Sequence, residues 1–81
     1  MPAYIVLDMR DDEILKAFGK QLRELREQSG LSQEKLAEFA DVHRNHEGLI
    51  ERGGANLTLL MIVALARALK VRPAKLLEKL R

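Results

Sequence analysis

The sequence HRNHE, which starts at His43, gathers the side chains best suited to chemistry in this chain of 81 residues. Arg44 offers a planar fork of donors that fits the two acceptors of guanine, and Asn45 can bond the edge of adenine. His43, His46 and Glu47 are three and four residues apart, a spacing at which side chains on a helix share one face and could bind zinc. The segment therefore permits either base recognition or metal binding.

Metal binding is the weaker of these two interpretations. Only three ligands are visible, and the chain has no cysteine to complete a closed site. The order of the ligands also differs from the zinc protease patterns. No Ser/His/Asp grouping, pair of catalytic carboxylates or phosphate-binding glycine loop stands out elsewhere. We therefore predict no metal, no other cofactor, no small-molecule effector and no enzyme activity.

A helix, a tight turn and a second helix must position HRNHE. Ala37 and Ala40 are small enough to let two helices cross closely, Asp41 can occupy the turn, and Val42 can fill the gap between them. His43 can then cap a helix that carries the base-reading side chains at its start. These are the elements of a helix-turn-helix, which presents one helix end rigidly to the major groove.

The first helix of the chain is expected to begin near residue 11, where Asp11 or Asp12 can cap it. Gly30 supplies a left-handed stop, and Gly19 inside the helix costs about 1 kcal/mol relative to alanine. The apolar stripe of this helix has intervals of four, four and three residues and consists of Ile14, Phe18, Leu22 and Leu25.

The remaining helices carry recognisable start signals. Ser32 can cap the second helix and Thr58 the fourth, while Pro73 suits the first position of the fifth. The third is expected to run from His43 to Arg52. The chain is thus predicted to be all-α: a compact five-helix domain over residues 11–81, which follows a short N-terminal arm, residues 1–10. This arm could be a strand, a segment that crosses a partner, or unstructured.

Composition and charge narrow the class of protein. The chain is 47% apolar and 32% charged, which favours a folded helical domain over a disordered one. Residues 1–42 carry six basic against nine acidic side chains, whereas residues 43–81 carry eight against three. Such a basic half suits a polyanion, although chance asymmetry on a solvated surface is the alternative. The absence of cysteines, of an apolar run of about 18–20 residues and of a secretory signal favours a cytoplasmic protein without a membrane segment.

A known family carries the same motifs. The sequences LRELREQSGLSQEKLAEFA, LIERG, NLT and ARALKVRPAKLL resemble the Cro/CI-type (XRE-like) helix-turn-helix repressors, and HRN followed by IERG more weakly resembles the controller proteins of restriction–modification systems. The resemblance covers residues 18–77 and implies a lambda-repressor-like domain that binds double-stranded operator DNA as a dimer. It places the DNA contacts at Gln33, His43, Arg44, Asn45, His46 and Gly48, with Arg52 and Asn56 near the phosphates.

Glu47 departs from the family pattern, which has an aliphatic residue at this position. Counted from Ile50, its side chain should face the core, where an unpaired carboxylate costs several kcal/mol or stays protonated. Three interpretations are open. Glu47 could find a basic partner or bend out to solvent, it could weaken the fold, or it could belong to a site.

Apolar residues near the C-terminus suggest self-association. The helix expected from Leu59 to Leu69 is apolar nearly all round, and a domain this small cannot cover all its faces. We expect a homodimer with twofold symmetry that uses Leu76, Leu77 and Leu80. The predicted function is a sequence-specific transcriptional regulator that binds an inverted-repeat operator. The alternative is a protein-interaction or dimerisation module of the same fold, with DNA binding weakened by Glu47 and Gly48.

Overall fold

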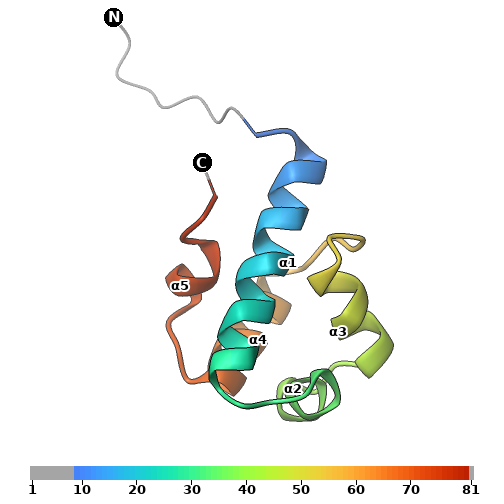
Figure 1. The fold of residues 1–81 in the computed structure, drawn as a ribbon, viewed down its shortest axis with the longest axis vertical. Helices are drawn as coiled ribbons and strands as arrows, with labels where there is room; N and C mark the ends of the chain where they lie inside the picture. Colours follow the sequence, from blue (N-terminus) through green and yellow to red (C-terminus); the bar gives the residue numbers. More distant parts are fainter. Residues whose placement is uncertain (1–8, 81) are drawn as a thin grey trace, which may run out of the picture.

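The computed structural model describes residues 9–80 and contains five helices (Figure 1). They are α1 (Asp11–Gln28), α2 (Gln33–Ala40), α3 (Arg44–Glu51), α4 (Leu59–Leu69) and α5 (Pro73–Leu77), and this part of the chain holds no strand. The all-α, five-helix prediction is therefore confirmed. The possible strand in the N-terminal arm lies outside the described residues.

Most of the predicted start signals act as expected. The Ser32 hydroxyl accepts a hydrogen bond from the backbone N–H of Lys35 at 3.0 Å, and Thr58 accepts one from Met61 at 3.1 Å. Pro73 is the first residue of α5. These bonds satisfy donors that the first turn of a helix leaves free, so they locate the helix starts.

The start of α1 differs from the prediction. Its cap is Arg10, whose backbone N–H donates to the Glu13 carboxylate at 3.0 Å. Asp11 and Asp12 consequently lie inside the first turn and do not cap it. Their charges still suit the positive end of the helix dipole. The helix begins at Asp11, close to the expected place, but its cap is Arg10 because the Glu13 carboxylate reaches back to the Arg10 backbone.

Two glycines end helices in the left-handed conformation. Gly30 follows α1 with φ of 73°, and Gly53 follows α3 with φ of 78°. In each case the next residue bonds back to the helix: Leu31 N–H donates to the Arg26 carbonyl at 3.2 Å. A residue with a side chain would be strained at either position, so the glycines fix where the chain turns.

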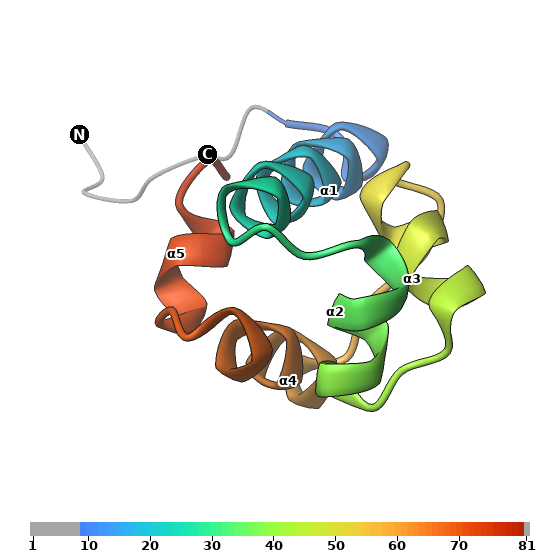
Figure 2. The same ribbon diagram turned by 60° about the horizontal axis from the view of Figure 1, so that its bottom comes forward.

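Every helix contributes one large aliphatic side chain that is fully buried in a single core. In Figure 2, α1 and α4 lie on opposite sides of the domain, with α5 at one end and α2 and α3 at the other. Burial of each side chain contributes about 1.5–3 kcal/mol, which is how such short helices are held. The five residues are Leu22, Leu36, Ile50, Leu65 and Leu76. None of the described helices is long and apolar enough to cross a membrane.

Gly19 allows a close contact between two helices, which its unfavourable helix propensity did not indicate. Gly19 faces the end of α3. A Cβ at this position would lie 2.5 Å from the Glu51 carbonyl oxygen and would also clash with the Ile50 carbonyl oxygen. A glycine is therefore needed for α1 to lie against the last turn of α3.

Candidate nucleic-acid interface

The turn between α2 and α3 is short and internally bonded. Asp41 adopts the left-handed conformation with φ of 56°, and the Val42 N–H donates to the Ala37 carbonyl at 2.9 Å. Ala37 and Ala40 are buried where the two helices meet, and Val42 packs against the core. The predicted helix-turn-helix is therefore present, and a hydrogen-bonded turn joins its two helices.

His43 caps α3, as its position suggested. Its Nδ1 accepts a hydrogen bond from the backbone N–H of Asn45 at 3.1 Å. A ring nitrogen that accepts cannot carry the proton, so a neutral His43 holds its proton on Nε2. The Asn45 side chain remains exposed beside it. One ring nitrogen of His43 is thus committed to the helix, and the other is available to a ligand.

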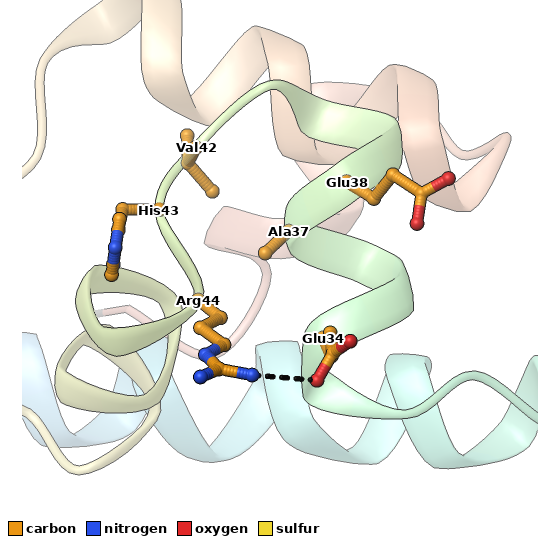
Figure 3. Close-up of a pocket in the computed structure, with 6 residues that line it drawn as sticks. All are labelled: Glu34, Ala37, Glu38, Val42, His43 and Arg44. Carbon is orange, nitrogen blue, oxygen red and sulfur yellow. Dashed lines mark hydrogen bonds and ion pairs between the residues drawn. The ribbon is translucent and has the colours of Figure 1, made fainter.

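Arg44 lies across a groove from Glu34. Figure 3 shows Arg44 at the start of α3 reaching toward α2, where its Nη1 is 3.0 Å from Glu34 Oε2. The groove has a volume of about 440 Å³. Both side chains are well over half exposed, so their ion pair is weak and can open when a ligand competes. Glu34 holds the Arg44 guanidinium at the surface without burying it.

Gly48 lies beneath two of the other predicted contact residues. A Cβ at Gly48 would be 3.2 Å from Arg52 Nη1 and 3.4 Å from Gln33 Oε1, and the residue is buried. The glycine therefore makes room for the ends of these two side chains. Gln33 and Arg52 themselves are exposed residues.

The last two predicted contacts differ in their surroundings. His46 is half-buried on α3, in the turn that carries Arg44 and Asn45. Asn56 is exposed in the loop before α4, where it lines a small pocket with Ile14 of α1. Asn56 is thus separate in sequence and in surroundings from the residues that lead α3.

A buried polar cluster anchors α3 to α1 and α2. Arg26 Nε donates to Glu51 Oε2 at 2.6 Å, and Arg26 Nη2 donates to Glu51 Oε1 at 3.1 Å. Gln33 Nε2 also donates to Glu51 Oε1 at 3.1 Å. Sequence reasoning missed this cluster. Once Glu47 was expected to face inward, Glu51 one turn later had to face inward too, and that was the available signal.

Glu47 is fully buried, and neither of its carboxylate oxygens has a hydrogen-bond partner. Burial raises the pKa of Glu47 to about 8, and the neighbouring Glu51 carboxylate, with its negative charge, raises it further. A protonated Glu47 can donate to the Glu51 carboxylate, whereas an ionised Glu47 finds no donor. The interpretation that Glu47 pairs with a base or reaches solvent is wrong, because Arg26 bonds Glu51 instead.

Glu51 behaves in the opposite way. Burial alone would raise its pKa, but hydrogen bonds from Arg26 and Gln33, together with the positive charge of Arg26, outweigh that effect and lower the pKa of Glu51. Two carboxyl groups in one apolar setting thus differ in charge because one of them holds all the donors.

The predicted dimer residues have different environments. Leu76 belongs to the core of the single chain and is fully buried, so its side chain is not free for a partner. Leu77 is 37% exposed, and Leu80 is half-buried. The most exposed apolar residues lie instead at the start of α4, where Leu59 and Leu60 are 72% and 79% exposed. Over the described residues, no three His, Asp or Glu side chains gather so that they could hold a metal ion.

Comparison with known proteins identifies relatives over most of this region. Residues 22–76 match the helix-turn-helix family. Control protein C.BamHI of Bacillus amyloliquefaciens is 44% identical over 62 residues, which are 75% of this chain and 76% of that protein. Control protein C.SmaI of Serratia marcescens is 37% identical over 67 residues, 83% of this chain and 80% of that protein.

A solved structure agrees with these sequences. The restriction-modification controller protein C.AhdI from Aeromonas hydrophila superposes with a TM-score of 0.76 and 47% sequence identity. The match covers 76% of this chain and 94% of that structure. The similarity therefore holds for the fold and for the sequence together.

Proposed function

This chain belongs to the helix-turn-helix family of DNA-binding transcription regulators, and we propose that it binds an inverted-repeat operator as a homodimer. It is a regulatory protein and not an enzyme. In this proposal α3 is the recognition helix, and its first turn enters the major groove. In the same proposal, the protein acts in the cytoplasm.

The carrying observation is the fixed and exposed start of the recognition helix. Arg44 and Asn45 lie exposed directly after the capping residue, on a helix locked by the turn at Asp41. Arginine fits guanine, and asparagine fits adenine, in the major groove. Gln33 at the start of α2 and Arg52 at the end of α3 come close to each other over Gly48, where contacts to phosphates would set the orientation of the protein. His43 and His46 complete the proposed contact surface.

The homodimer is proposed from the apolar residues that the single chain leaves exposed. Leu59 and Leu60 open α4 with most of their surface in solvent, and Leu77 of α5 is partly exposed. Contact with a second copy would remove this surface from water, at about 25 cal/mol per Å² buried. A twofold axis would then set two recognition helices about 34 Å apart, one turn of the DNA helix.

The target genes are proposed from the relatives. C.AhdI is described as a restriction-modification controller protein, and C.BamHI and C.SmaI as control proteins. We propose the same role here: control of the genes of a restriction–modification system. Selected operators should then map upstream of such genes in the genome that encodes the chain. A set of operators that maps consistently to unrelated promoters would overturn this assignment.

One experiment tests the DNA-binding proposal directly. The chain is used to select duplexes from a random pool, and the affinity for the selected duplex is then measured at several salt concentrations. We expect an inverted repeat and a steep loss of affinity as salt rises, because phosphate contacts release counterions. Failure to enrich any sequence, combined with association that ignores salt, would favour the alternative of a protein-interaction module.

A further inference from the structure

Two buried carboxyl groups share one positive charge beneath the recognition helix. Glu47 and Glu51 are one helical turn apart on the inward face of α3, and both side chains are buried. Arg26 is the only cation that acts on them within the described residues, and its hydrogen bonds go to Glu51. Arg26 also donates through Nη1 to the Leu31 carbonyl at 2.8 Å, and it makes no hydrogen bond to Glu47.

The charged and polar groups around the Glu47 and Glu51 pair come from three helices. α1 supplies Arg26, whose charge favours ionised Glu47, and α3 supplies Glu51, whose charge opposes it. α2 supplies Gln33, which is neutral and donates to Glu51. Like charges repel strongly in a low-dielectric setting. The single positive charge of Arg26 can therefore balance one ionised carboxyl group in the cluster, but a second is strongly disfavoured. The second carboxyl group must carry a proton or leave the core.

We propose that Glu47, against Glu51, is a proton-binding site that locks the recognition helix onto the core, and that loss of this proton in alkaline conditions releases the helix. The effect on folding stands by itself, whereas its consequence for operator recognition rests on the proposed function. Glu47 is four residues before Glu51 and three after Arg44, so its movement into solvent disturbs both the anchor and the reading end of α3.

The direction of the pH effect follows from proton linkage. The pKa of Glu47 is about 8 in the folded chain and 4.5 for an ordinary glutamate, so folding takes up one proton between these values. The equilibrium constant for folding therefore falls about tenfold for each unit of rising pH in this window and levels off above it. Stability from the proton is complete below the lower value and is lost as pH rises toward the upper one.

The test compares urea unfolding of the native chain with Glu47→Gln between pH 5 and pH 9. The amide keeps the shape of the acid, can donate to Glu51 and does not titrate. We expect the ratio of the two folding constants to change about tenfold per pH unit up to pH 8, in favour of Glu47→Gln at high pH. Glu24→Gln, at an exposed position of α1, should track the native chain throughout. Parallel curves for the native chain and Glu47→Gln would overturn the proposal.

A second measurement does not depend on any variant. The carboxyl carbon signal of Glu47, followed by NMR in the native chain, should titrate near pH 8, and a midpoint near 4.5 would overturn the proposal.

A third measurement tests the link to DNA recognition. Affinity for the selected duplex should fall from pH 6 to pH 9 for the native chain and less for Glu47→Gln. If neither protein binds DNA but the unfolding curves diverge, the proposed function fails and the proton site stands. If both bind DNA with the same pH dependence, the link between the proton and recognition is refuted.

Discussion

Arg26 of α1 and Glu51 of α3 form a buried ion pair with an Nε–Oε2 distance of 2.6 Å. This pair joins the helix that carries the proposed reading residues to the longest helix of the domain. Two further side chains act on Glu51: Gln33 donates a hydrogen bond to its carboxylate, and the carboxyl group of Glu47 lies next to it. The same contact that holds the recognition helix in place therefore makes it sensitive to charge.

Removal of the cation should damage the fold severely. Arg26→Met leaves two carboxyl groups buried without a positive partner, and loss of one member of a buried pair costs about 3–5 kcal/mol. Urea unfolding at pH 7 measures the change. Arg23→Met is the matched control, because Arg23 pairs with Glu27 on the surface of the same helix and should cost less than about 1 kcal/mol. Similar losses in the two variants would contradict the anchoring role of Arg26.

An aliphatic residue in place of Glu47 should stabilise the protein at pH 8. Glu47→Ile removes a buried carboxyl group that lacks a donor, and we expect a gain of about 1–3 kcal/mol. The melting temperature should rise by about 4–8 °C for each kcal/mol gained. The same substitution at exposed Glu24 should change stability by less than about 0.5 kcal/mol. A lower melting temperature for Glu47→Ile would show that the carboxyl group is stabilising where it stands.

Alanine at Gly19 should destabilise the domain even though alanine is the better helix former. The gain in helix propensity is about 1 kcal/mol, but the added Cβ would meet the backbone of Glu51 at 2.5 Å. Because backbone cannot rotate away, α1 and α3 must separate, and we expect a net loss of about 1–3 kcal/mol in the free energy of unfolding. Lys20→Ala, at the next and exposed position, should be close to neutral. A stabilised Gly19→Ala would mean that the two helices do not approach so closely.

The two arginines of the proposed interface should fail in different ways. Arg44→Ala should weaken binding to the selected duplex by about 1–3 kcal/mol and relax its base preference, because a base contact is lost. Arg52→Ala should weaken binding to every duplex alike and reduce the salt slope by about 1. Fluorescence anisotropy with selected and scrambled duplexes separates the two effects. If Arg44→Ala still distinguished the selected duplex from the scrambled one as well as the native chain does, Arg44 would not be a base-contacting residue.

A charge at the start of α4 should abolish the proposed dimer. Leu60→Glu places a carboxylate on the most exposed large apolar residue of the described chain, where contact with a second copy would have to desolvate it. Sedimentation equilibrium should then report a monomer at concentrations where the native chain is a dimer. Leu49→Ser, on the recognition helix, should keep the native mass. A dimer that survives Leu60→Glu would place the interface elsewhere.

The sequence by itself determined most of the points where helices begin or end, with the cap of α1 at Arg10 as the exception. The Ser32 and Thr58 caps, the stop at Gly30 and the proline at the start of α5 all act within one helical turn. Interactions of this range depend only on neighbouring residues, so a pattern of residue types is enough to predict them. The inward direction of Glu47 followed in the same way from the period of the helix.

Tertiary structure decided which of these residues matter to one another. Arg26 and Glu51 are 25 positions apart, and Gly19 meets the carbonyl end of a different helix. Leu76 entered the core of its own chain, and the exposed leucines proved to be those that open α4. No local pattern encodes such pairings, because they arise from the angles at which helices cross. Burial also favours the protonated form of Glu47, because the packed core excludes water from its carboxyl group. Arg26 does not offset this effect, since its hydrogen bonds go to Glu51.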